Sequence, residues 1–149
     1  MRQDRRGARS WFKRHESLSL YALVGAGAGI GGVARLLVSL AAIDIAGPEF
    51  PWGTLIANIA GSFAIGFYAA LSGPGGRHPN DEKVRHFVMT GLCGGFTTFS
   101  VFSLEMVQYL AGREYALAGG YLGASMAMWL VAVWLGFAWA RRINRATDP

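Results

Sequence analysis

Residues 91–102 read Gly-Leu-Cys-Gly-Gly-Phe-Thr-Thr-Phe-Ser-Val-Phe and lie in the middle of the third long apolar segment of the chain. A glycine weakens a helix interior by roughly 1 kcal/mol, and threonine and serine hydroxyls compete for backbone hydrogen bonds. The pairs Gly94-Gly95 and Thr97-Thr98 therefore predict a break in the helix. Hydrocarbon cannot satisfy the freed backbone groups, so a break at membrane depth is tolerated only inside protein or beside a water-filled path. The break is either a functional site or a glycine kink that lets helices pack closely.

The composition indicates an integral membrane protein. Of 149 residues, 52% are apolar and 15% are charged, with the charge concentrated near the chain ends. Segments close to the ~20 residues that a bilayer span requires lie at residues 18–43, 53–72, 84–111 and 115–140. The predicted fold class is all-α, with four transmembrane helices and the third helix broken mid-span. The predicted membrane domain covers 18–142, after a basic cytoplasmic tail at 1–17 and before a short C-terminal tail at 143–149.

The basic residues describe topology and not a nucleic-acid partner. Nearly all of the 14 Lys and Arg residues flank the apolar segments, as topology signals do. With both termini on one side of the membrane, twelve of them lie on that side and only Arg113 lies in the opposite loops. Basic residues near spans favour the cytoplasm, so this bias predicts a subunit with both termini inside. The single Cys93 lies within a span and can form no intrachain disulfide.

Polar side chains at membrane depth are candidates for a site because burying them in lipid is costly. Arg35, in the first span, must either snorkel to an interface or meet a polar partner. Thr54, Asn58 and Ser62 follow at i, i+4 and i+8, which places them on one face of the second helix. Asn58 offers two N–H donors, which either line a polar path or bind a neighbouring helix.

The second half of the third span carries aromatic rings and an acid at a regular spacing. Phe96, Phe99, Phe102 and Glu105 recur every three residues, which places Phe99, Phe102 and Glu105 near one face of the resumed helix. The edge of a phenylalanine ring carries partial positive charge and can favour an anion. The alternative for such an aromatic stripe is simple packing. Beside the break and an intramembrane carboxyl, the rings are candidate site residues.

Three segments of the chain read Gly-Gly-Val-Ala-Arg at 31–35, Gly-Thr-Leu-Ile-Ala-Asn-Ile-Ala-Gly at 53–61 and Gly-Leu-Cys-Gly-Gly-Phe-Thr-Thr-Phe-Ser at 91–100. They resemble the signature segments of the Fluc (CrcB) fluoride channels. The resemblance implies a fluoride-specific channel of the plasma membrane that exports cytoplasmic fluoride passively and lowers its toxicity. It also implies an antiparallel dimer with two fluoride pores, formed with itself or with an oppositely oriented homologue. A structural sodium ion, Na+, which is not transported, would lie at the dimer centre.

The resemblance also implies roles for individual residues, carried over by position. The main-chain carbonyls of Gly94 and Thr97 would bind sodium, and Arg35 and Thr54 would be structural. The anion path would be lined by Asn58, Phe99, Phe102, Thr98, Ser100, Glu105, Tyr121 and Ser125. The chain departs from the family pattern at Val101, commonly a threonine, and at Trp129, often a small hydroxyl residue. The polar wall of the pore is therefore expected to differ from that of its relatives, and the long basic tail is also atypical.

Other classes of function fit the sequence less well. His15 and His78 lie outside the spans, His86 lies at a span edge, and no metal-ligand pair or nucleophile–base motif is present, so no enzyme is expected. A proton-coupled small exporter would carry an acid in its first span, where this chain has Arg35. A non-transporting membrane scaffold would not need Asn58, the break and Phe99 together.

Overall fold

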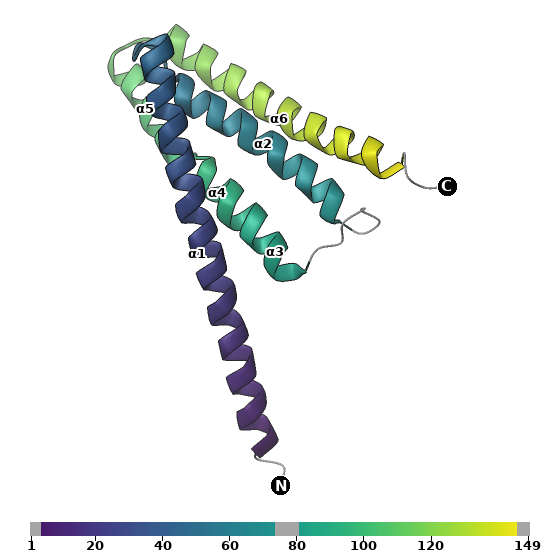
Figure 1. Ribbon diagram of the computed structural model, residues 1–149. Coiled ribbons are helices and arrows are strands. Elements are labelled where there is room, and N and C mark those ends of the chain that lie inside the picture. The colour runs from purple at the N-terminus through teal and green to yellow at the C-terminus, as the bar shows by residue number, and fades with distance from the viewer. Residues whose placement is uncertain (1–3, 74–80, 146–149) are drawn as a thin grey trace.

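The computed structural model describes residues 4–73 and 81–145, and residues 4–16 by their backbone alone. Its helices are α1 (Asp4–Ala46), α2 (Trp52–Ser72), α3 (Glu82–His86), the π-helix η1 (Phe87–Cys93), α4 (Gly94–Phe96), α5 (Ser100–Ala111) and α6 (Tyr115–Arg145) (Figure 1). The described residues contain no strand. Segments long and apolar enough to cross a membrane lie at Ser17–Ala46, Trp52–Ser72, Glu82–Ala111 and Tyr115–Arg145, which confirms the prediction of an all-α chain with four spans.

The four spans run up and down. The connection between α1 and α2 and the connection between α5 and α6 lie at one end of the molecule, and both termini point away from that end (Figure 1). α1 is longer than predicted, because its helix begins at Asp4 and continues through the basic segment into the first span without interruption. The described part of the chain does not include the side chains of that segment. It also does not include Arg77 in the middle loop or residues 146–149.

Glycines let the spans approach each other backbone to backbone. α1 packs against η1 and α4, and α2 packs along α6. A Cβ atom on Gly95 would lie 2.8 Å from the Ala28 Cα in α1, and one on Gly66 would lie 2.9 Å from the Val133 carbonyl carbon in α6. Real side chains do not fit at such distances. Small residues at these positions therefore set the spacing of the helices, as is common where lipid offers no hydrophobic driving force.

The buried centre of the subunit is small and lies between α2, α5 and α6. Leu55, Phe102 and Tyr121 form it, and partly buried side chains such as Trp129 pack against it. Large apolar side chains remain exposed on every span, for example Leu130, which is 69% exposed. Such a surface suits lipid or another membrane subunit and not water.

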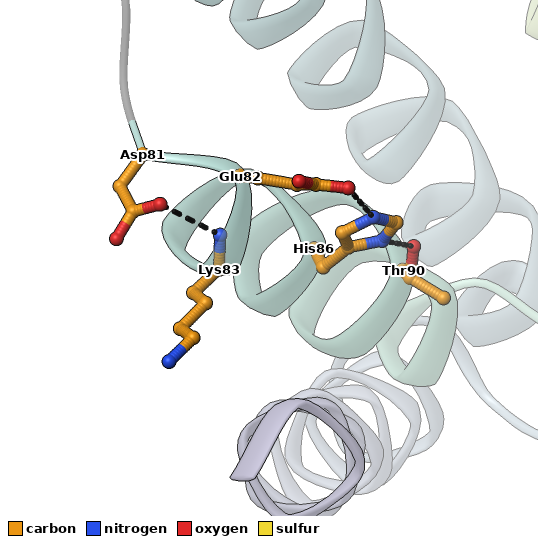
Figure 2. Close-up of polar contacts among 5 residues, drawn as sticks. All are labelled: Asp81, Glu82, Lys83, His86 and Thr90. Atoms are coloured by element: carbon orange, nitrogen blue, oxygen red, sulfur yellow. Dashed lines mark hydrogen bonds and ion pairs between the residues drawn. The ribbon is translucent and has the colours of Figure 1, made fainter. Parts of the chain in front are cut away.

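The third span begins in a short polar network. The Asp81 carboxylate accepts a hydrogen bond from the Lys83 backbone N–H at 3.5 Å and caps α3 (Figure 2). Glu82, His86 and Thr90 follow at intervals of one helical turn. Glu82 Oε1 lies 3.8 Å from His86 Nε2, and His86 Nδ1 lies 3.5 Å from Thr90 Oγ1. Together these contacts hold the first turns of the span, where backbone N–H groups have no helical partner.

The break in the third span lies at residues 97–99, after the glycine pair and not within it. Gly94 and Gly95 stay helical in α4, so of the two pairs that predicted the break only Thr97-Thr98 lies in it. Thr97 leaves the helix with an extended backbone, φ −82° and ψ 158°. Gly95 is needed for contact with Ala28 of α1, whereas the Thr98 hydroxyl accepts the Val101 N–H in place of a helical carbonyl. Close helix packing therefore involves Gly95, and the break itself lies at the adjacent residues 97–99.

Candidate functional site

Asn58 of the neighbouring helix α2 holds the backbone of the break in place through two hydrogen bonds. Its Nδ2 donates to the Thr98 carbonyl oxygen at 2.8 Å, and its Oδ1 accepts from the Thr98 backbone N–H at 2.7 Å. The side chain is 4% exposed within the subunit. A primary amide has two N–H donors, and these bonds use only one of them. Asn58 thus satisfies the freed backbone of Thr98 and keeps one donor for another acceptor.

Two main-chain carbonyls at the break lose their helical donors. In a continuous helix the Gly94 carbonyl would accept from the Thr98 N–H, but that group donates to Asn58. The Thr97 carbonyl would accept from the Val101 N–H, but that group donates to Thr98 Oγ1 at 3.2 Å. Neutral carbonyl oxygens are hard ligands that suit an alkali cation. The Gly94 and Thr97 carbonyls expected to bind sodium are therefore among the carbonyls at the break whose helical donors are used elsewhere.

Threonine and serine hydroxyl groups form further hydrogen bonds at the break. Thr97 Oγ1 donates to the Cys93 carbonyl oxygen at 3.0 Å, beside the backbone bond from the Thr97 N–H to the same oxygen at 2.9 Å. Thr98 Oγ1 lies 3.2 Å from Ser100 Oγ. Thr98 Oγ1 also accepts the Val101 N–H, so it satisfies one of the first backbone N–H groups of α5, much as a capping hydroxyl does.

Arg35 meets a polar partner inside the protein. Its Nε donates to the Gly95 carbonyl oxygen at 3.3 Å, so a cation from α1 lies next to the break. Of the two alternatives for this residue, an interface or a polar partner, the structure shows the second. A positive charge at this depth is stabilised by backbone carbonyl dipoles and itself favours a nearby anion.

Phe99 and Phe102 lie in different environments. Their ring centroids are 5.9 Å apart, but Phe99 is 66% exposed on the subunit whereas Phe102 is 2% exposed. Phe102 packs against Tyr121 at 5.1 Å and Trp129 at 4.9 Å. Phe99 can therefore face a path or a partner subunit directly, while Phe102 is held by the core with its ring near that of Phe99.

Glu105 joins three helices. The Thr54 hydroxyl donates to one carboxylate oxygen at 2.6 Å, and the Tyr121 hydroxyl donates to the other at 2.8 Å. α2, α5 and α6 thus meet at a single carboxyl group. Ser125, one turn beyond Tyr121, is fully buried, and its hydroxyl has no hydrogen-bond partner among the described residues. One hydrogen-bond network therefore joins Thr54, which was expected to be structural, to Glu105 and Tyr121, which were expected near the pore.

Two residues line a cavity at the break although the sequence did not predict them as site residues. The cavity, about 210 Å³, is bounded by Ser62 and Trp129 together with Asn58, Thr98 and Phe99. Ser62 is one turn after Asn58, which was a usable signal in the sequence. For Trp129 the sequence offered only its position one turn after Ser125, and its large ring gave no indication that it would line this cavity.

A comparison with protein families identifies one matching family. The family described as CrcB-like protein, Camphor Resistance (CrcB), matches residues 22–137. The chain belongs to this family. The matched residues include every residue of the site, from Arg35 to Trp129. The basic segment before residue 22 lies outside the match.

Curated relatives in several bacteria carry the same functional name. The chain is 54% identical over 127 residues to a fluoride-specific ion channel FluC 1 of Rhodopseudomonas palustris, covering 85% of this chain and 90% of that protein. It is 50% identical over 133 residues to a FluC 1 of Bradyrhizobium diazoefficiens, with 89% and 92% covered. A fluoride-specific ion channel FluC of Opitutus terrae is 46% identical over 127 residues, with 85% and 96% covered.

Proposed function

We propose that this chain forms a fluoride-specific channel in the plasma membrane, through which cytoplasmic fluoride leaves the cell passively. Its relatives are named as fluoride channels over nearly their full length. The observation in the structure that carries the proposal is Asn58, which braces the break at Thr98 and keeps one N–H donor beside an exposed Phe99. A membrane-embedded break that only packed helices would not need an unused donor.

The chemistry of the path fits weak binding of a small anion. Fluoride enters cells as the neutral acid, dissociates near neutral pH and is then trapped as an anion, so its export needs only a path down its gradient. The Asn58 amide and the edges of Phe99 and Phe102 replace part of the hydration shell without a full positive charge in contact. Binding of this kind is strong enough for entry and weak enough for release.

The proposal includes a structural sodium ion and a dimer. The carbonyls of Gly94 and Thr97 would hold the ion, with the same carbonyls of an antiparallel partner doubling the set of ligands. When bound, the ion would supply positive charge that fixes the freed backbone at the dimer centre. The unused carbonyls and the exposed Phe99 support this part of the proposal.

The orientation of the subunit is a separate proposal that rests on charge. Twelve basic residues on the side of the termini against one on the other favour insertion with both termini in the cytoplasm. An antiparallel partner of such a subunit would then be an oppositely biased homologue, and a dual-topology homodimer is the alternative. Single cysteines placed in the tail and in the loop near Arg113, in a Cys93→Ala background, decide this by labelling in intact cells. Equal labelling from inside and outside would contradict the fixed orientation.

The direct test of the function is fluoride efflux from liposomes that contain the purified protein, with sodium on both sides. The proposal predicts fast fluoride efflux and no chloride efflux above that of protein-free vesicles. A membrane scaffold would release no fluoride, and a proton-coupled exporter would release it only under a proton gradient. Fluoride efflux at the rate of empty vesicles would overturn the proposal.

A further inference from the structure

The cavity beside the break extends past Asn58 along α2. Its volume of about 210 Å³ far exceeds the roughly 10–15 Å³ that one ordered water needs. Ser62, one helical turn beyond Asn58, lies on the same wall, and Trp129 of α6 forms another wall. The cavity thus continues beyond the donors considered so far and has room for a small ion with some of its water.

Trp129 carries a donor that the subunit leaves unused. Its Nε1 is buried and has no hydrogen-bond partner among the described residues. The ring packs edge to face on Phe102, with centroids 4.9 Å apart and an interplanar angle of 71°. A buried N–H without an acceptor costs the protein the desolvation of that group, so an acceptor bound in the adjoining cavity would stabilise it.

Ser62 supplies a second donor from the facing helix. Its hydroxyl can donate one hydrogen bond, and the side chain lines the cavity together with Asn58. The described residues that line this cavity include neither a carboxylate nor a basic side chain. Neutral donors without a competing acid bind a small anion, and without a fixed cation they also release it.

We infer that the Ser62 hydroxyl and the Trp129 indole N–H form a second fluoride position, one helical turn from Asn58. Fluoride leaving the free Asn58 N–H would pass to these two donors before it is fully hydrated again. Successive weak sites lower the barrier between them, as in other selective channels. The inference deepens the proposed channel function and rests on it.

Trp129→Phe tests this position, because it removes the N–H and keeps an aromatic ring against Phe102. In liposomes the initial rate of fluoride efflux is expected to fall by roughly tenfold, the scale of losing one hydrogen bond to a charged group. Trp134→Phe is the matched control on the same helix. Trp134 is 65% exposed and is not among the residues that line this cavity, so its replacement is expected to leave the rate unchanged.

Ser62→Ala is expected to slow efflux several-fold, and the double variant with Trp129→Phe is expected to be less slow than the product of the two single effects. Two donors that share one ion couple in this way, whereas independent packing defects add. Wild-type efflux rates in both single variants would overturn the inference. The inference would also be overturned if the effects of the two single variants simply multiplied in the double variant while the dependence of the efflux rate on fluoride concentration stayed the same. That result would assign both residues a packing role.

A spectroscopic measurement on the unaltered sequence separates binding from folding. The five indole N–H signals of the ¹⁵N-labelled protein in nanodiscs are assigned by single Trp→Phe replacements at the other four tryptophans. The Trp129 signal should shift on addition of sodium fluoride and not of sodium chloride. No shift would overturn the inference even if Trp129→Phe fails to assemble. Absence of wild-type efflux would refute the channel function, and the same titration would still decide whether the position binds fluoride.

Discussion

The two halves of the third span are held in different ways. Before the break, η1 and α4 contact α1 through backbone atoms, with glycines where a side chain would collide. After the break, α5 is held by side chains, through the packing of Phe102 and the two hydrogen bonds of Glu105. The first half therefore depends on shape and tolerates no added atom at the contact. The second half depends on side-chain chemistry, so it should respond in graded steps to substitution.

The largest effect is expected from Gly95→Val in the first half. The new side chain would overlap the backbone of Ala28, and overpacking of this kind costs about 1–3 kcal/mol or more. We expect loss of folded protein in detergent, measured as the yield of monodisperse material in size-exclusion chromatography. Gly94→Ala is the matched control, since a Cβ there meets nothing closer than the Met89 carbonyl oxygen at 3.9 Å. Equal yields for the two variants would show that shape does not limit this half.

A smaller effect is expected from Glu105→Gln in the second half. A glutamine amide is neutral and keeps one carbonyl oxygen for the two hydroxyls of Thr54 and Tyr121, so one hydrogen bond is lost and the other is no longer charge-assisted, at a cost of about 1.5–3 kcal/mol. The protein should still fold, with a lower unfolding temperature and fluoride efflux reduced about tenfold. Glu114→Gln, an exposed acid between α5 and α6, should change neither. An unchanged unfolding temperature for Glu105→Gln would contradict the role of this carboxyl as a joint between helices.

The smallest effect is expected at the break itself from Thr97→Ser. Serine keeps the carbonyl and the hydroxyl that donates to Cys93, and it loses only a methyl group, worth about 0.8 kcal/mol of burial. Efflux should stay within about twofold of the wild type. Thr97→Pro is the contrasting variant, because it removes the N–H that donates to Cys93 and should abolish efflux.

Replacing sodium with a large organic cation should slow efflux and loosen the dimer. Unchanged transport and dimer stability would exclude a structural sodium ion.

The sequence predicted the fold because lipid imposes simple rules. The length and apolarity of the four segments were sufficient for four spans, and helix-breaking residues were sufficient for a break in the third. The Thr97-Thr98 pair gave the position of the break correctly, but the Gly94-Gly95 pair did not, because helix propensity counts against both glycines and cannot register the contact of Gly95 with Ala28 of α1. That contact depends on how two helices far apart in sequence pack. For residues 1–17 the sequence predicted only a basic tail, and the structure continues α1 back to Asp4 in this segment.

The site was predictable in its residue types and not in its partnerships. Asn58 was identified as a mid-span amide that needs a partner, but its two bonds to Thr98 depend on the three-dimensional placement of α2 beside the break. The sequence singled out Thr54, Glu105 and Tyr121 separately. Nothing in their spacing shows that the Thr54 and Tyr121 hydroxyls both donate to the Glu105 carboxyl group. Trp129 was noted only as a departure from the family pattern. Its unused N–H became visible once the packing of its ring on Phe102 was known.

The central claim is that the break braced by Asn58 is a path for fluoride, and Asn58→Asp tests it most directly. Aspartate has nearly the same shape and keeps an acceptor for the Thr98 N–H, but it replaces both N–H donors with a negatively charged oxygen that repels an anion. Asn144→Asp is the control, because Asn144 makes the same kind of amide bond, to the Ala70 carbonyl at 2.9 Å, away from the break.

The measurement is the initial rate of fluoride efflux from liposomes that contain equal amounts of assembled protein. Like charges about 4 Å apart repel by about 4 kcal/mol near a protein surface, so we predict a loss of at least about a hundredfold for Asn58→Asp. Asn144→Asp should match the wild type. Wild-type efflux from assembled Asn58→Asp protein would contradict the claim that fluoride passes this residue.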